Sequence, residues 1–126
     1  MSTLTLKLLK ENFSIHSLAV DSQIPAAVFT APIYFIGKTF DEVSIVLPST
    51  IKIESEDVEP DWQALEVVGP LDFNLTGILS SISTVLANDK ISIFAVSTFD
   101  TDYILVKSSK VNDAVAALRN NNFQVI

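Results

Sequence analysis

Two short segments of this chain carry groups that could bind a small charged molecule. Residues 97–103 hold the carboxylates of Asp100 and Asp102 between two apolar stretches, and residues 69–73 directly precede an amphipathic helix. Backbone N–H groups at the start of a helix are free to bind an anion, whereas carboxylates accept hydrogen bonds from a cation. We therefore expect a binding site, without a catalytic residue, for a molecule that carries both charges, such as an amino acid.

The second of these segments lies between a predicted strand and a predicted helix. Residues 62–68 have the pattern of a strand, which Gly69 and Pro70 end. Apolar side chains then recur every three or four residues, which predicts a helix capped by Asp72 or Asn74. The apolar stripe consists of Leu75, Ile78, Leu79, Ile82, Val85 and Leu86.

A pair of antiparallel strands follows this helix. Residues 91–96 are apolar at nearly every position, which predicts a strand in the centre of a sheet. After a turn over residues 98–102, residues 103–106 return as the next strand. Asp100 and Asp102 are thus expected at the tip of a hairpin.

A second helix and a last strand complete the C-terminal half. Ser108 or Ser109 is expected to cap the helix, the asparagines at 120–122 to end it, and residues 123–126 to form the strand. The helix has an apolar stripe of Val111, Ala114, Val115 and Leu118. The order βαββαβ predicts an α+β ferredoxin-like plait, in which both helices cover one face of a four-stranded antiparallel sheet.

The N-terminal half shows strand patterns and no helical stripe. The expected strands are residues 4–9, 13–20, 33–37 and 43–47. Between the last two strands, Thr39-Phe40-Asp41 repeats the Thr98-Phe99-Asp100 of the later hairpin. The repeat predicts duplication of one unit, with chance identity over three residues as the alternative. We predict a reduced, mostly β half over residues 1–60, which ends in an acidic linker at 51–61, and a complete βαββαβ domain over 61–126.

Composition limits the possible partners. A chain of 126 residues with 48% hydrophobic residues can bury a core, and its apolar excess predicts a homodimer. The net charge of −7 and the scattered basic residues argue against nucleic acid and against a membrane surface. The absence of cysteine, of a signal-peptide pattern and of an apolar run of roughly 20 residues fits a soluble, cytoplasmic protein.

Nothing in the sequence predicts catalysis, a metal or a cofactor. His16 is the only histidine, has no nucleophile motif near it, and is expected to lie on the face of a strand. Asp100 and Asp102 do not follow the spacing of a calcium loop, and three scattered glycines cannot build a phosphate loop. We expect a protein that is not an enzyme.

Residues in both halves resemble small stand-alone ACT-domain proteins. The likeness lies in residues 62–65, 69–73, 77–79, 93–107 and, in the first half, 39–46, so it covers nearly the whole chain. These proteins are similar to the regulatory ACT domains of aspartate kinase and to the cytosolic arginine sensor of animal cells. The resemblance implies two ACT-like halves in tandem, a regulatory amino-acid-binding role, and dimers that join their sheets edge to edge.

The resemblance also implies where the ligand lies. In aspartate kinase and the arginine sensor, it lies between paired ACT units, held by the loop after the first strand and the turn between the second and third strands. The matching residues here are Asp72, Phe73, Asn74, Thr76, Gly77 and Ile78 on one wall, and Thr98, Phe99, Asp100, Thr101 and Asp102 on the other. The arginine sensor has an acidic residue just before its helix glycine, whereas this chain has Leu75 and Thr76, so this position does not predict a ligand with a cationic side chain.

Several of these residues also have a purely structural explanation. A glycine inside a helix costs about 1 kcal/mol relative to alanine, so either a ligand carboxylate or the sheet is expected to approach Gly77 closely. Asp72 is explained by helix capping and Asp100 by hydrogen bonds within its turn. Asp102 is the better candidate for ligand contact, because it begins the third strand.

We expect a non-catalytic regulatory protein that senses an amino acid. The alternative is a protein–protein interaction module that keeps the ACT fold without a ligand and docks through its sheet edge or dimer face. Loss of a ligand response in Gly77→Val and Asp102→Ala, without unfolding, would separate the first possibility from the second.

Overall fold

The computed structural model describes residues 4–68 and 77–126, which form two compact units. We call residues 1–10 and 63–126 the helical unit and residues 11–62 the strand unit. The sequence predicted that residues 1–60 form one half. In the structure, residues 1–10 belong instead to the same compact unit as the C-terminal residues. The segment that crosses between the units, β5 (Asp57–Val67), contributes its first part to the strand unit and its last part to the helical unit.

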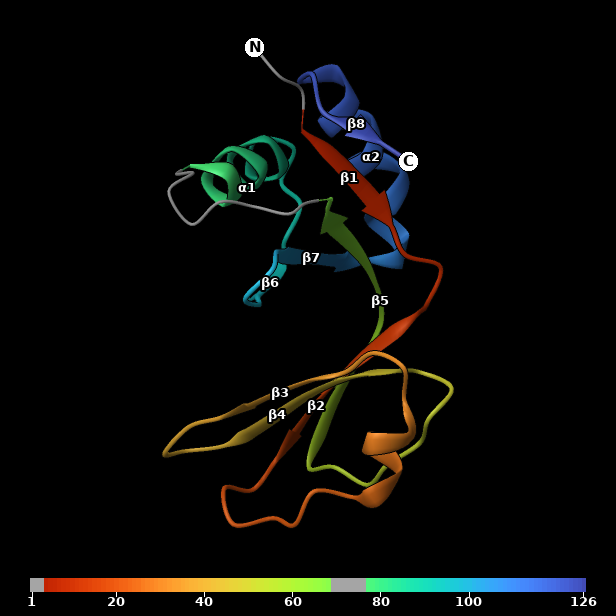
Figure 1. Ribbon diagram of the computed structural model, residues 1–126, viewed down its shortest axis with the longest axis vertical. Coiled ribbons are helices and arrows are strands. Elements are labelled where there is room, and N and C mark those ends of the chain that lie inside the picture. The colour runs from red at the N-terminus through yellow and green to blue at the C-terminus, as the bar shows by residue number, and fades with distance from the viewer. Residues whose placement is uncertain (1–3, 69–76) are drawn as a thin grey trace. The chain divides into compact units, whose positions relative to one another are not determined.

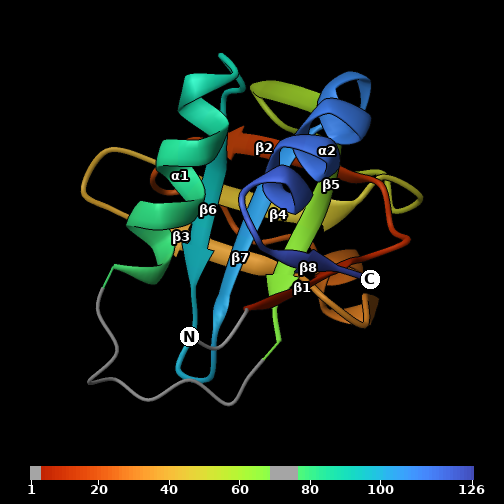
Figure 2. The ribbon, with the colours of Figure 1, turned by 90° about the horizontal axis from the view of Figure 1, so that it is seen from above.

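The helical unit contains the predicted α+β order with one additional strand (Figure 1). Its elements are β1 (Thr5–Leu8), the last part of β5, α1 (Ile78–Asn88), β6 (Phe94–Ser97), β7 (Asp102–Lys107), the 3₁₀ turn η2 (Ser108–Lys110), α2 (Val111–Asn120) and β8 (Gln124–Val125). The strands pair in the order β6-β7-β5-β1-β8. The predicted ferredoxin-like plait is confirmed, with both helices in front of the strands in Figure 2.

The predicted four-stranded antiparallel sheet is wrong in one respect, because β1 lies between β5 and β8. Leu6 pairs with Val67 of the antiparallel β5 on one side and with Val125 of the parallel β8 on the other. Leu6 is fully buried in the same core as Leu65 and Leu118. Burial of this leucine explains why β1 joins the C-terminal residues rather than its neighbours in sequence.

A second correction concerns β6, which was expected in the centre of the sheet. Among the described residues β6 pairs with β7 alone, so it is the edge strand of the helical unit. Its side chains alternate between half-buried and exposed, as expected for an edge strand. The continuous apolar run over residues 91–96 is therefore not a sign of burial on both faces of the sheet.

The described parts of both predicted apolar stripes pack into the core, and Leu75 of the first stripe lies outside the described residues. Ile82 and Leu86 of α1 and Ala114 and Leu118 of α2 are fully buried in one core cluster with Ile104 of β7. The caps differ from expectation, because Lys110 precedes α2, where Ser108 or Ser109 was predicted. At the end of α2, Asn122 adopts the predicted left-handed conformation with φ 70°.

The strand unit is built from β2 (Phe13–Leu18), the 3₁₀ turn η1 (Ala26–Thr30), β3 (Phe35–Lys38), β4 (Val43–Pro48) and the first part of β5. These strands pair in the order β3-β4-β2-β5. Its core contains Val28, Val43, Ile45 and Leu47, against which Ile51 and Ile53 pack. The predicted linker over 51–61 is therefore wrong, because its isoleucines contact the core and residues 57–61 belong to β5.

Candidate functional site

The predicted turn between β6 and β7 has a defined hydrogen-bonding pattern. Ser97 pairs with Asp102, and the Thr98 N–H donates to the Thr101 carbonyl at 2.8 Å. The Thr98 hydroxyl donates to the same carbonyl at 3.0 Å and accepts the Thr101 N–H at 3.3 Å. The turn therefore occupies residues 98–101, and Asp102 is the first residue of β7.

Thr101 connects this turn to the strand that precedes the other predicted wall. Its side chain is buried, with 7% exposure, and its hydroxyl donates to the backbone carbonyl of Val67, the last residue of β5. The tip of the β6–β7 hairpin is thereby held at the C-terminal end of β5. Figure 2 shows that the start of α1 lies at this end of the helical unit as well.

Asp102 lies on the helix-covered face of the sheet. Successive strand side chains alternate between faces, so Asp102 shares a face with Ile104 and Val106. Both of these residues belong to the core cluster that includes α1 and α2. Asp102 is half-buried and lies at the first position of β7, the end of the strand nearest the start of α1.

Gly77 has a different role from the one expected. It is the N-cap of α1, with φ 79°, and not a residue inside the helix. A Cβ at this position would meet no described atom within 4 Å, which argues against close packing on the sheet. The left-handed backbone alone explains the glycine, and its carbonyl accepts from the Ser81 N–H at 2.8 Å. Ile78 follows as the first helical residue and packs against the core.

The other predicted residues are either exposed or outside the described part of the chain. Phe99 is 81% exposed at the tip of the turn, and Asp100 beside it is exposed. Asp72, Phe73, Asn74 and Thr76 lie outside the described residues, as does the predicted helix cap at Asp72 or Asn74.

The hairpin of the strand unit repeats the geometry of the β6–β7 hairpin. Lys38 pairs with Val43, as Ser97 does with Asp102, and the residues behind them pair in the same register. The Thr39 N–H donates to the Glu42 carbonyl at 3.0 Å, and the Thr39 hydroxyl accepts the Glu42 N–H at 3.2 Å. Phe40 at the tip is 98% exposed. The two turns thus share their sequence motif and these two hydrogen bonds.

Two side chains near the turn were not singled out from the sequence. The Tyr103 hydroxyl lies 3.4 Å from a Glu66 carboxylate oxygen, across β7 and β5. Burial, and then the negative charges of Glu66 and Asp100, raise the pKa of Tyr103 above its ordinary value, so the phenol stays protonated at neutral pH. No local signal could have predicted this pair, because it depends on which strands are neighbours.

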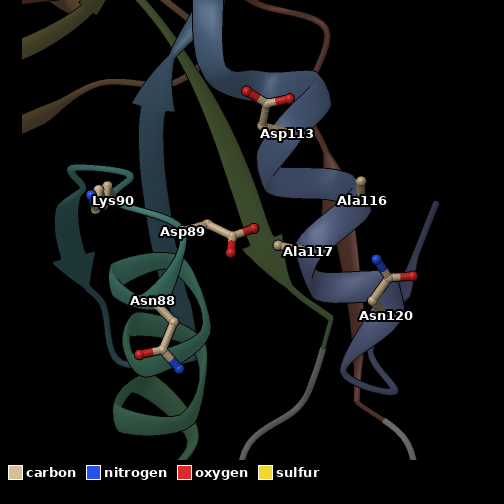
Figure 3. Close-up of a pocket in the computed structure, with 7 residues that line it drawn as sticks. All are labelled: Asn88, Asp89, Lys90, Asp113, Ala116, Ala117 and Asn120. Atoms are coloured by element: carbon tan, nitrogen blue, oxygen red, sulfur yellow. The ribbon is translucent and has the colours of Figure 1, made fainter.

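A surface pocket lies away from the predicted site, between the end of α1 and α2. Figure 3 shows Asp89 directed toward α2, where Ala116 and Ala117 line the opposite side. The pocket has a volume of about 320 Å³ and is also lined by Asn88, Lys90, Asp113 and Asn120. The described residues contain no group of three or more side chains suited to a metal ion.

His16 lies on β2, as predicted for a strand-face histidine. Its side chain is buried on the core face, and its Nδ1 lies 2.9 Å from the Ser55 hydroxyl. Burial, and secondly the positive charge of Lys52, lower the pKa of His16, so the ring is neutral at neutral pH. The contact joins Ser55 to β2 within the strand unit.

The order and pairing of the elements in the helical unit define a ferredoxin-like α+β domain. The ACT-domain profile matches residues 57–120, and the chain belongs to the ACT-domain family. No curated protein matches the chain. Within the described residues, no helix is long and apolar enough to cross a membrane.

Solved structures agree with this assignment. A protein from Agrobacterium tumefaciens is 32% identical, with a TM-score of 0.91, and the match covers 100% of this chain and 94% of that one. The regulatory subunit of aspartate kinase from Thermus thermophilus is 12% identical, with a TM-score of 0.66 and coverage of 91% and 95%. A Vibrio cholerae protein of unknown function, described as a possible transport protein, is 16% identical, with a TM-score of 0.73 and coverage of 94% and 89%. The likeness to aspartate kinase regulatory domains is thus confirmed at the level of the fold, and that to the arginine sensor stays a prediction.

Proposed function

We propose that this protein is a non-catalytic regulatory protein that binds an amino acid at the end of the helical unit where β5 ends and α1 begins. The observation that carries the proposal is the hydrogen bond from Thr101 to the Val67 carbonyl, which holds the β6–β7 turn at that end. Membership of the ACT-domain family and the fold of an aspartate kinase regulatory subunit support a regulatory role.

The proposed site combines opposite charges. The start of α1 offers backbone N–H groups to a ligand carboxylate, since the first turn of a helix has no internal acceptors for them. Asp102, on the helix-covered face, would accept hydrogen bonds from the ligand ammonium group. The proposed site residues are Asp72, Phe73, Asn74, Thr76, Gly77, Ile78, Thr98, Phe99, Asp100 and Asp102, with Thr101 beside them.

We propose in addition that the protein forms a homodimer in the cytoplasm. The support for a dimer is β6, an edge strand that carries the apolar residues Phe94 and Val96 and could extend a sheet into a second copy. Size-exclusion chromatography with light scattering measures the mass directly, and a monomer at all concentrations would contradict the dimer.

Thermal unfolding in the presence of each of the twenty amino acids, and of common nucleotides as a comparison set, tests the ligand. An amino acid at a hundredfold excess over its Kd stabilises the folded state by about 2.7 kcal/mol. Asp102→Ala is expected to abolish the shift for that amino acid, whereas the control Asp41→Ala, in the matching turn of the strand unit, should leave it intact. No shift with any amino acid would contradict the proposal.

A second candidate function is supported by the exposed aromatic rings. Phe40 and Phe99 are 98% and 81% exposed, and exposed aromatic side chains are common anchors of protein interfaces. A protein–protein interaction module without a ligand would explain both rings. In that case, Phe40→Ser and Phe99→Ser would reduce capture of a partner, and no amino acid would shift the unfolding temperature.

A further inference from the structure

The two matching turns differ at their fourth residue. In the helical unit this residue is Thr101, which is buried and donates its hydroxyl to a backbone carbonyl of the neighbouring strand β5. In the strand unit it is Glu42, which is exposed. Its carboxylate accepts from the Ser44 hydroxyl at 2.9 Å and lies 3.5 Å from the Ser17 hydroxyl. The same turn is therefore anchored by a buried bond in one unit and by an exposed carboxylate in the other.

We propose that Thr101 is a positioning residue of the amino-acid site, which fixes the β6–β7 turn, and with it Asp102, against the end of β5. This inference rests on the proposed function for its ligand-dependent part. A buried hydroxyl without a partner is costly, so the bond to Val67 persists whenever the turn is folded. A turn that is already fixed loses little freedom on binding, and preorganisation of this kind increases affinity.

The strand unit supplies an internal comparison for the proposal. There a second contact holds the hairpin next to its turn, because the ammonium of Lys38, the last paired residue before the turn, donates to the Val20 carbonyl at 2.7 Å. This bond is exposed, and the residue that matches Lys38 in the helical unit is Ser97, whose side chain is too short for such a contact. Thr101 is therefore the buried anchor of the turn in the helical unit, whereas the turn of the strand unit has the Lys38 contact in addition to those of Glu42.

Amide hydrogen exchange of the full chain without any ligand tests the positioning role directly. Thr101→Val preserves the shape of the side chain and removes the hydroxyl, and it should speed exchange at the Thr98 and Thr101 amides by about tenfold, the effect of roughly one hydrogen bond. Thr101→Ser should restore protection, and amides of α1 and α2 should not change. Glu42→Val, at the matching position, should leave the β6–β7 turn unaffected. Unchanged exchange in Thr101→Val would overturn the proposal.

Titration with the amino acid found by thermal unfolding tests the consequence for binding. Thr101→Val should raise Kd by about tenfold, whereas Thr101→Ser and Glu42→Val should stay within about threefold of the natural protein. Equal losses in Thr101→Val and Thr101→Ser would show that packing, and not the hydroxyl, matters, and would overturn the proposal. If no amino acid binds, the proposed function fails, and the exchange experiment alone still decides whether Thr101 fixes the turn.

Discussion

The β3–β4 and β6–β7 hairpins have the same backbone and different surroundings. Thr39 and Thr98 make equivalent bonds across their turns, and the second residue of each turn is an exposed phenylalanine. The fourth residue then determines whether the turn is anchored by a buried hydroxyl, as at Thr101, or by an exposed carboxylate, as at Glu42. The comparison teaches that a short motif fixes local geometry, whereas one side chain decides what the turn is attached to.

The largest expected effect concerns the cores of the two units. Leu6→Ala should lower the free energy of unfolding by about 2–5 kcal/mol, because the side chain is fully buried and leaves a cavity. Hydrogen exchange should become faster in α1 and α2, whereas the control Leu18→Ala should affect β2 and β4. Faster exchange in β2 and β4 upon Leu6→Ala would contradict the grouping of β1 with the helical unit.

A smaller effect would test whether the two turns are equivalent. Thr39→Val and Thr98→Val each remove a hydroxyl that accepts a turn N–H, so each should cost about 0.5–1.5 kcal/mol of stability. Urea unfolding of the two variants measures both costs. A clear loss in only one of them would break the structural equivalence of the turns.

The strand unit alone should contribute a histidine-dependent change of stability with pH. Because burial lowers the pKa of His16 in the folded state, the unfolded chain binds more protons on this ring at acidic pH. The stability that neutral His16 contributes is therefore present above about pH 6.5. It is lost progressively as the pH falls below that value toward the folded-state pKa. Urea unfolding from about pH 7.5 to about pH 5.5 should show a weaker pH dependence in His16→Gln. Equal dependence in both proteins would contradict this role.

The smallest expected effect on stability lies at the tips of the hairpins. Phe40→Ala and Phe99→Ala should each change stability by no more than about 0.5 kcal/mol, because both rings are exposed. If the amino-acid site lies at the β6–β7 turn, only Phe99→Ala should alter the ligand-induced shift in unfolding temperature. An equal change in both variants would contradict a ligand site at the β6–β7 turn.

Much of the fold followed from local patterns in the sequence. The stripe containing Ile82 and Leu86 predicted α1, and the repeated Thr-Phe-Asp motif identified two hairpins that prove to share their register. The position of β1 could not be predicted, because Leu6 is paired with Val125 at the far end of the chain. The role of Gly77 was missed for a related reason, since the helix pattern cannot show where a first turn begins.

The candidate site could be predicted only in part. The turn at 98–102 was located from its residues, but the buried bond from Thr101 to Val67 depends on which strand lies beside the turn. The pair of Tyr103 and Glu66 and the pocket beside Asp89 depend in the same way on neighbours in space. Sequence patterns therefore indicated which residues could bind a ligand, and the structure distinguishes those that hold the turn from those that are exposed.

The insertion of β1 between β5 and β8 has a consequence for the order of events during synthesis. The strand unit is one contiguous stretch, residues 11–62, so all its strands are available early. The helical unit can complete its sheet only after residues 124–125 have been made, because β1 pairs with β8. Such distant pairing slows folding. Until β8 has been made, β1 lacks one of its two neighbouring strands, and an unpaired strand edge of this kind favours misassembly.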